Sequence, residues 1–369
     1  MSAIFAYYFP QFYETKENSM WWGAGFTDWK LVEAAKPLFA EHYQPRVPEL
    51  GYYDQSELKT LSMQVDLAKQ FNITGFNFYH YWFDGEPHLA KPAEMLLADI
   101  DLNIKFMLTW ANESWTRQWV GQPNDYLIEQ NYYRDLDSIE KHYFYLAAFF
   151  KDDRYHKVNN RPVFTIYRPE LIPNLSDVIS TFNKLAVADG FSGIHWLACR
   201  SYDISGAEEL YQYFDGIINF NPRYIINTRL KNRRTALVEP LLRRLPEKTQ
   251  SLLVGLFRKK NGIAKFSYVD FLRELERSDS LSFSKPVYHS VFPDWDNTAR
   301  YNDRATLFTD VSPENYKNAL SIAQNKITQE HQDILFINAW NEWSEGAYLE
   351  PDQKIGLKLL TVTSSFSGF

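Results

Sequence analysis

Short runs of apolar and aromatic residues recur along the whole chain, and each has the length of a β-strand. Several of these runs are almost continuously apolar, which is typical of parallel strands that are covered on both faces. The pattern predicts eight strands, at Ile4–Phe9, Gly75–Trp82, Ile104–Trp110, Pro162–Tyr167, Ile194–Cys199, Gly216–Phe220, Val287–Phe292 and Ile334–Trp340.

Apolar residues at helical spacing fill most of the gaps between these runs. The clearest helix start is at Ser312, which can cap a helix whose first position is Pro313. The predicted helices are Ser56–Phe71, Ser138–Phe150, Leu175–Ala188, Ala207–Phe214, Tyr268–Leu275 and Pro313–Gln329. Alternating strands and helices indicate an α/β fold, and eight strands favour a (β/α)8 TIM barrel. An open dinucleotide-binding sheet is disfavoured because its Gly-rich phosphate loop is missing from the sequence.

Two connections are much longer than the others, Gln11–Asp54 after the first strand and Asn221–Ser267 after the sixth. We predict one barrel domain over residues 1–369 with these two segments as loop insertions. The second insertion contains Arg229–Lys260, which is rich in basic residues and leucine. Such a segment suits peripheral contact with an anionic membrane surface, and equally a solvated, charged helical hairpin.

Composition narrows the class of protein. A single Cys excludes an internal disulfide, and a net charge of −7 argues against a nucleic acid partner. The N-terminal residues lack the basic region of a signal peptide, and no apolar run is long enough to span a bilayer. These features predict a cytoplasmic protein, or one at the inner-membrane surface. Aromatic residues make up 17% of the chain, an excess that needs a reason.

Two carboxylates follow the eighth predicted strand, Glu342 and Glu345, with Trp340, Asn341 and Trp343 beside them. In a TIM barrel the active site lies at the carboxyl ends of the strands. Both carboxylates face one pocket only if the chain turns between them, and they can then divide acid and base roles at a sugar. The alternative is a pair of exposed loop acids that cap the next helix.

Other strand ends carry similar groups, because Trp faces stack on sugar rings while Asn, Glu and Arg bind hydroxyls. Trp110 and a Glu113–Arg117 pair have an alternative role, as a core residue and an i, i+4 helix pair. His80 is as typical of a core as of a site, and Asp296 with Arg300 suits a structural ion pair. The candidate substrate-binding residues are Tyr8, Trp22, Trp29, His80, Tyr81, Trp82, Trp110, Asn112, Glu113, Arg117, Asp296, Arg300, Trp340, Asn341 and Trp343.

The sequence contains no motif that is typical of a metal site or of a serine hydrolase. The chain has eight His but no His-x-x-x-His pair, no Cys cluster and no Gly-x-Ser-x-Gly motif. We therefore expect neither a metal nor another cofactor.

Several motifs, in order and over nearly the whole chain, resemble the WbsX-type proteins, which are encoded with bacterial O-antigen and other surface-polysaccharide genes and are related to glycoside hydrolase family 99. The resemblance rests on Tyr7–Phe12, Trp21-Trp22-Gly23, Gly25–Trp29, His42–Arg46, Trp110–Glu113, Asp296–Arg300, Trp340–Gly346 and Glu350-Pro351. It does not extend to the basic insertion or to Thr361–Phe369.

This resemblance implies a (β/α)8 enzyme that cleaves α-mannosides with retention and without a metal. It maps the two working glutamates onto Glu342 and Glu345. Glu342 would deprotonate the sugar 2-hydroxyl, which attacks its own anomeric carbon, and Glu345 would protonate the leaving oxygen and then activate the acceptor. This route needs a 2-hydroxyl trans to the leaving group, as in an α-mannoside or α-rhamnoside.

The resemblance and the residues together predict a retaining glycoside hydrolase or transglycosylase. Its substrate would be a bacterial surface polysaccharide or an oligosaccharide precursor of one. A lipid-linked precursor is one option. Two alternatives stay open: a sugar-nucleotide-dependent glycosyltransferase of lipopolysaccharide biosynthesis, and a non-catalytic glycan-binding protein that has kept the cleft.

Overall fold

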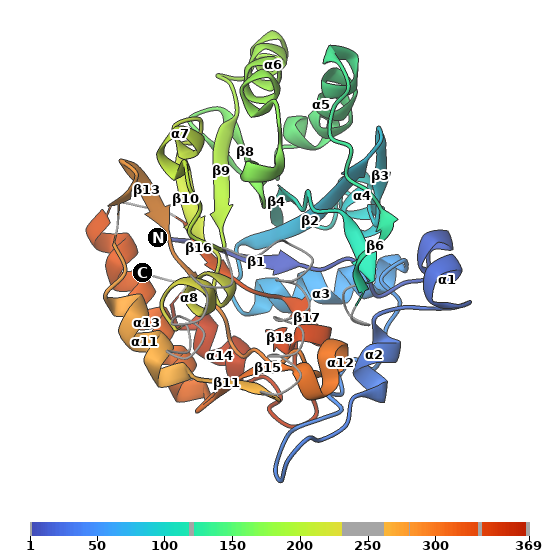
Figure 1. Ribbon diagram of the computed structural model, residues 1–369, viewed down its shortest axis with the longest axis vertical. Helices are drawn as coiled ribbons and strands as arrows, with labels where there is room; N and C mark the ends of the chain where they lie inside the picture. The colour runs from blue at the N-terminus through green and yellow to red at the C-terminus, as the bar shows by residue number, and fades with distance from the viewer. Residues whose placement is uncertain (1, 118–121, 231–261, 280, 331–333, 367–369) are drawn as a thin grey trace, which may run out of the picture.

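The computed structural model describes residues 2–117, 122–230, 262–279, 281–330 and 334–366. Parallel strands curve into a barrel at its centre, and helices pack around the outside (Figure 1). The predicted fold class is therefore confirmed. In sheet order the parallel strands are β13 (Lys285–Tyr288), β10 (Gly216–Asn219), β9 (His195–Arg200), β8 (Arg161–Ile166), β4 (Lys105–Trp110), β2 (Gly75–Phe83), β1 (Ala3–Tyr8), β16 (Ile334–Ile337) and β14 (Ser290–Val291).

The seventh predicted strand brings the two edges of this sheet together. It is split into β13 and β14, with only His289 between them. β13 pairs in parallel with β10, whereas β14 pairs in parallel with β16. One short segment thus bonds to both edges of the sheet and nearly closes the barrel. Each of the eight predicted strands overlaps an observed one.

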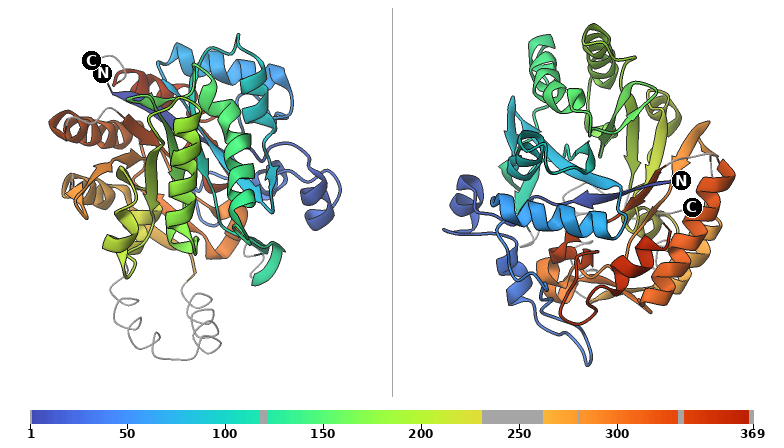
Figure 2. Two further views of the ribbon diagram at one scale, coloured as in Figure 1. Left: turned by 90° about the horizontal axis from the view of Figure 1, so that it is seen from above. Right: turned by 180° about the vertical axis from the view of Figure 1, so that it is seen from behind.

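Helices cover the outside of the barrel, and α5 and α6 lie side by side there (Figure 2). Asp135 and Ser138 cap α5 reciprocally, and the Asn315 amide donates to Ser312 Oγ at the predicted start of α13. The helices that the pattern predicted are α3 (Leu58–Gln70), α5 (Leu136–Lys151), α6 (Leu175–Ala188), α7 (Ala207–Tyr211), α11 (Tyr268–Glu276) and α13 (Pro313–Glu330). α7 is shorter than predicted.

Further helices were not predicted, and several of them belong to the long connections. α1 (Lys16–Trp22) and α2 (Trp29–Ala34) lie in the first insertion, and α8 (Arg223–Thr228) opens the second. Residues 231–261, and with them almost all of Arg229–Lys260, lie outside the described residues. The remaining helices are α4 (Lys91–Ala98), α12 (Thr298–Tyr301) and α14 (Lys358–Ser364), with 3₁₀ turns at Pro169–Leu171, Asn302–Arg304 and Trp343–Glu345.

Several short strands lie outside the parallel barrel sheet. The pairs that matter for the site are the hairpin of β5 (Trp115–Arg117) with β6 (Gln122–Ile128), and β17 (Asn341–Glu342) with β18 (Ala347–Tyr348). The others are β3 (Glu86–His88), β7 (Lys157–Val158), β11 (Ala264–Ser267), β12 (Leu281–Ser282) and β15 (Thr306–Thr309).

The core is strongly aromatic. Trp110, Trp196 and Trp340 are among the largest fully buried side chains, together with several Tyr and Phe residues. Much of the aromatic excess therefore stabilises the barrel itself, since each such ring buries a large apolar area. Among the described residues, no helix is both long and apolar enough to cross a bilayer.

Candidate active site

A pocket opens where the carboxyl ends of the barrel strands meet, so that segments far apart in the sequence share its walls. Its empty volume is about 1000 Å³, part of it open to solvent. The lining residues are Phe9, Gln11, Asn18, Trp21, Trp22, Tyr79, Tyr81, Ala111, Glu113, Ser114, Trp115, Thr116, Leu127, Tyr167, Phe220, Arg223, Arg300, Tyr301, Asn338, Glu342 and Glu345.

The backbone after β16 turns both glutamates toward this pocket. Glu342 ends β17, and the 3₁₀ turn Trp343–Glu345 follows directly. Residues three apart lie on the same side of such a turn, so Glu342 and Glu345 both line the pocket. Each side chain is only 6% exposed. The alternative of two exposed loop acids is therefore wrong.

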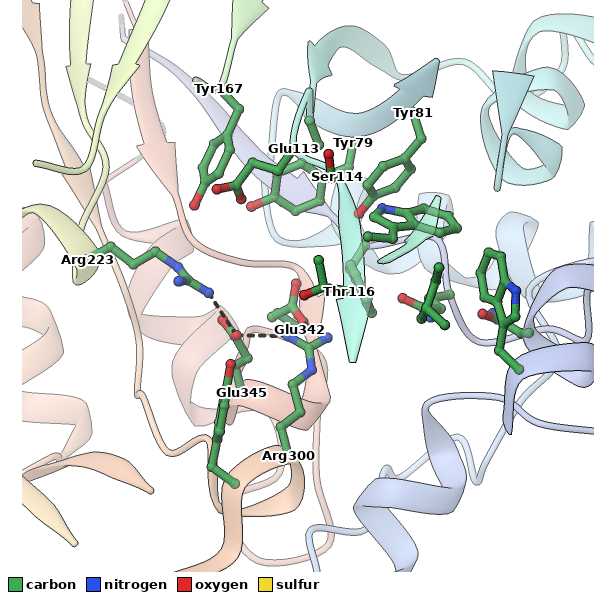
Figure 3. Close-up of a pocket in the computed structure, with 18 of the residues that line it drawn as sticks. Tyr79, Tyr81, Glu113, Ser114, Thr116, Tyr167, Arg223, Arg300, Glu342 and Glu345 are labelled. Carbon is green, nitrogen blue, oxygen red and sulfur yellow. Dashed lines mark hydrogen bonds and ion pairs between the residues drawn. The ribbon is translucent and has the colours of Figure 1, made fainter. Parts of the chain in front are cut away.

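Arg300, on α12, bridges the two carboxylates (Figure 3). Its Nη2 donates to Glu342 Oε1 at 2.8 Å, and its Nη1 lies 2.8 Å from Glu345 Oε1. The same Nη2 donates to Asp28 Oδ2 at 2.9 Å. Asp28 also accepts a hydrogen bond from the hydroxyl of Ser344, one of the two residues between the glutamates, at 2.6 Å. One planar guanidinium thus fixes the relative position of both carboxylates.

A second arginine, Arg223 at the start of α8, contacts Glu345. Arg223 Nη2 donates to Glu345 Oε1 at 3.0 Å, the oxygen that Arg300 also contacts. The Arg223 guanidinium lies over the ring of Trp295, at 5.7 Å from its centroid. Its side chain is 37% exposed, whereas that of Arg300 is 6% exposed. Arg300 is thus part of the buried framework, and Arg223 is open to the pocket.

The electrostatic environment favours a proton on this carboxylate pair. Burial raises the pKa of Glu342 to about 8. Arg300 opposes the rise, while the carboxylates of Glu345 and Asp28 add to it. A carboxyl group with a pKa near neutral pH can accept and return a proton during a reaction, which is what acid–base catalysis requires.

A third glutamate supports the motif from behind. Glu350 is buried, and it accepts hydrogen bonds from Tyr53 Oη at 2.6 Å, Gln64 Nε2 at 2.6 Å and Trp343 Nε1 at 2.7 Å. Burial raises the pKa of Glu350 to about 7, and its hydrogen-bond donors limit the rise. Through Trp343, Glu350 holds the turn that carries Glu342 and Glu345.

Aromatic rings line much of the rest of the pocket, and Tyr81 lies on the far side of it from Arg223 (Figure 3). The ring of Trp115, at the start of the β5–β6 hairpin, lies 5.1 Å from that of Tyr81 and 5.8 Å from that of Trp21 on α1. Trp22 lies beside them, with the Arg117 guanidinium 5.4 Å from its centroid. Such surfaces suit the apolar C–H faces of sugars. We call this group of rings, Tyr81, Trp115, Trp21 and Trp22, the aromatic wall.

Comparison with models of protein families assigns the chain to a family. A model described as "Glycosyltransferase WbsX" matches residues 4–363. The chain belongs to the WbsX glycosyltransferase family. This confirms the resemblance seen in the motifs, and a carbohydrate-active family agrees with the expected class of enzyme.

Curated relatives of this WbsX-family chain include the "Uncharacterized protein WxcX" of two Xanthomonas campestris pv. campestris strains. The protein of strain B100 is 31% identical over 367 residues, which are 98% of this chain and 49% of the relative. The protein of strain ATCC 33913 is 30% identical over the same shares. The chain thus spans about half the length of the curated relatives that it matches.

Solved structures show the same fold at low sequence identity. The family 99 endo-α-mannosidase of Bacteroides thetaiotaomicron superposes with a TM-score of 0.58 at 13% identity, covering 98% of this chain and 96% of that one. A structure described as "Glycoside hydrolase-like protein" gives a TM-score of 0.58 at 11% identity, covering 100% and 94%. At such identities the likeness supports the fold of this WbsX-family chain and nothing finer.

The structure brings six of the residues singled out from the sequence together at the pocket. They are Trp22, Tyr81, Glu113, Arg300, Glu342 and Glu345. Glu113 forms a short ion pair with Arg168, the residue that follows Tyr167 at the end of β8.

Most of the other candidates lie in the core and do not line the pocket, so the structure shows them packing or hydrogen-bonding there, and their role in substrate binding stays a prediction. Tyr8 Oη donates to Gln64. His80 Nε2 lies 2.8 Å from His142 Nε2. Tyr8, Trp29, His80, Trp82, Trp110, Asn112, Trp340, Asn341 and Trp343 are all buried and absent from the pocket lining.

Asp296 and Arg300 each make their ion pairs with other residues, so the expected pairing between the two is corrected. Asp296 accepts from His42 and Gln44 and pairs with Arg46, and its backbone amide donates to Glu345 O at 2.8 Å. It supports the turn that carries Glu342 and Glu345 from outside the pocket.

The expected helical pair of Glu113 with Arg117 is also wrong. Arg117 lies in strand β5 and pairs with Asp125 at 3.1 Å. It reaches the pocket region only by packing on Trp22.

Several lining residues were missed from the sequence, notably Tyr167, Arg223, Tyr301 and Asn338. Tyr167 follows β8 directly, and Arg223 comes shortly after the end of β10, so the rule that singled out the other strand ends would have found them. Among the described residues, no group of three or more His, Cys, Asp and Glu is placed to hold a metal ion.

Proposed function

We propose that this chain is a retaining glycoside hydrolase or transglycosylase that acts on an α-mannoside or α-rhamnoside in a bacterial surface polysaccharide or its precursor. The observation that carries the proposal is the carboxylate pair of Glu342 and Glu345, bridged by Arg300 and facing a pocket with an aromatic wall. Membership of the WbsX family and the fold of a family 99 endo-α-mannosidase support it.

The reaction would proceed in two balanced steps. In the first, Glu342 takes the proton of the sugar 2-hydroxyl, whose oxygen attacks the anomeric carbon, and Glu345 gives its proton to the leaving oxygen. This breaks the glycosidic bond and leaves a 1,2-anhydro sugar. In the second, Glu345 takes the proton of water or of an acceptor hydroxyl that attacks the same carbon, and Glu342 returns its proton to the 2-oxygen. Two inversions give net retention.

The raised pKa places a proton on Glu342, the proposed base, so this proton has to reach Glu345 before the first step. The first step requires one proton on the two carboxylates together. Because the pKa of Glu342 is about 8, the pair holds a proton at neutral pH. Arg300 keeps both carboxylates in place while that proton moves between substrate and enzyme.

The test is turnover of α-mannosides and α-rhamnosides with an activated leaving group. Glu345→Gln should lower turnover at least about 100-fold, since a general acid contributes about 10²–10⁴-fold. Exposed Glu276 on α11 offers a matched control, and Glu276→Gln should leave turnover unchanged. Equal turnover by wild type and Glu345→Gln would refute the assignment. Ligand binding without any turnover would favour a glycan-binding protein.

A second candidate is glycosyl transfer from a nucleotide sugar, which the family's description favours. Its test is a panel of nucleotide sugars, followed by thermal shift and by release of free nucleotide. Saturable, acceptor-dependent release of nucleotide would establish this activity in place of the first.

A further inference from the structure

Two arginines contact one oxygen of Glu345. Its Oε1 lies 2.8 Å from Arg300 Nη1 and 3.0 Å from Arg223 Nη2. Arg300 alone already holds the carboxylate, since it bridges Glu345 to Glu342 and is anchored by Asp28. Positioning therefore does not account for the second arginine.

The exposure of Arg223 indicates that it also meets the substrate. It lines the pocket and is 37% exposed, and its aliphatic stem leads from α8 to a guanidinium over the ring of Trp295. Arginine presents a planar fork of donors that matches carboxylate and phosphate oxygens. A guanidinium at the open side of a pocket can bind such a group without first being freed from the core.

The position of Arg223 defines which part of a substrate it would meet. Glu345 is the residue proposed to protonate the leaving oxygen, and Arg223 contacts Glu345 from the side opposite to Tyr81 and the aromatic wall (Figure 3). A sugar stacked on the aromatic wall would lie on one side of Glu345. The group attached to the leaving oxygen would then lie on the other side, next to Arg223.

We propose that Arg223 is a specificity-determining residue that binds an anionic group, a phosphate or a carboxylate, on the leaving-group side of the substrate. This inference rests on the proposed function, because that function assigns the leaving oxygen to Glu345.

The test measures binding and needs no turnover. The ligands are α-mannose 1-phosphate against methyl α-mannoside, and an α-mannosyl-glucuronic acid disaccharide against α-mannosyl-glucose, with the corresponding α-rhamnose series. Dissociation constants are measured by titration calorimetry for wild type, Arg223→Gln and Arg223→Lys. Arg277 is an exposed arginine paired with Glu274 at the end of α11, so Arg277→Gln is the matched control.

Wild type should bind at least one anionic ligand about 10-fold or more tightly than its neutral partner, as expected for charge-assisted hydrogen bonds. Arg223→Gln should reduce this preference to less than about 2-fold, Arg223→Lys should keep part of it, and Arg277→Gln should keep all of it. Preference for the phosphate series or for the uronate series identifies the source of the anion.

Three results would overturn the proposal: no anion preference in wild type, a preference that survives Arg223→Gln, or an equal loss of neutral and anionic binding in that variant. Failure of the proposed function is distinguished separately. If Glu345→Gln turned over substrate normally while the anion preference depended on Arg223, the chemistry would be wrong and the anion site would stand.

Discussion

Gly346 packs directly against the backbone of Asp296: a Cβ on Gly346 would lie 2.9 Å from both the N and the O of Asp296. The φ angle of Gly346 is +66°, a region that L side chains rarely adopt. The Asp296 amide in turn donates to Glu345 O at 2.8 Å. This contact joins the segment after the seventh strand to the turn that carries both glutamates.

Gly346→Ala should therefore displace Glu345 as well as strain the backbone. We expect it to lower the free energy of unfolding by about 2–4 kcal/mol and turnover at least about 10-fold. Gly356 has nearly the same φ of +60° but open space around a Cβ, so Gly356→Ala should cost only about 1 kcal/mol and spare turnover. Urea unfolding and turnover measure both effects. Equal losses in the two variants would show that the Asp296 contact is unimportant.

The bridging role of Arg300 predicts that a positive charge alone at this position is insufficient for activity. Lysine is a compact point charge and cannot hold Glu342, Glu345 and Asp28 as the planar fork of Arg300 does. Arg300→Lys should reduce kcat about 100-fold, because a carboxylate misplaced by about 1 Å loses catalytic alignment. The exposed Arg273, paired with Asp270, provides the control Arg273→Lys. A kcat within about 3-fold of wild type would contradict the bridging argument.

The pH dependence of activity follows from the proton on the carboxylate pair. The first step needs one proton on Glu342 and Glu345 together, whichever of the two holds it in the empty site. Since the pKa of Glu342 is about 8, that proton is lost as the pH rises through about 8. The profile of kcat/KM should therefore fall on its alkaline side near pH 8. Activity that kept rising well above pH 8 would be incompatible with this assignment.

The barrel could be predicted from the sequence because its strands are buried on both faces and so appear as apolar runs. Because both faces of these strands are apolar, the pattern does not show which residues of a run face the pocket. In β2, Tyr79 and Tyr81 line the pocket, whereas His80 and Trp82 pack against His142 on α5. This is the alternation of side chains along a strand. Applying it to the strand end would have separated Tyr81 from its two neighbours.

Other parts of the site depend on long-range contacts that no local pattern contains. Glu342 and Glu345 could be identified because both belong to one motif. Their link to Arg300 depends on how the segment after β14 folds back, and their link to Arg223 on how α8 begins. Spacing within the chain carries no information about either distance.

The buried histidine pair predicts how stability depends on pH. His142 Nδ1 lies 2.6 Å from Tyr133 Oη, and its Nε2 lies 2.8 Å from His80 Nε2. Burial lowers the pKa of His80 to about 3 and that of His142 well below its ordinary value of 6.5. Both stay neutral in the folded state but take up protons in the unfolded chain below pH 6.5.

Their contribution to stability is therefore complete above pH 6.5 and is lost as the pH falls toward the folded-state values, by up to about 1.4 kcal/mol per pH unit for each histidine. His142→Phe should be less stable at pH 7.5, because it leaves His80 and Tyr133 without this partner. Between pH 6.5 and 5, however, its unfolding free energy should fall less steeply than that of wild type. Urea unfolding at several pH values tests this, and identical slopes would contradict it.

Substitution should divide the aromatic residues at the strand ends into those that bind substrate and those that stabilise the core. Trp115 is half-buried in the pocket wall, whereas Trp110 is 1% exposed in the core. Trp115→Ala should weaken oligosaccharide binding about 10-fold, because it removes a stacking surface, and should lower the unfolding free energy less than Trp110→Ala does. Trp110→Ala should cost about 3–5 kcal/mol of stability, because it leaves a cavity in the barrel. If Trp115→Ala destabilised the fold as much as Trp110→Ala while binding persisted, the aromatic wall would be a structural feature, and the sugar would have to bind elsewhere in the pocket.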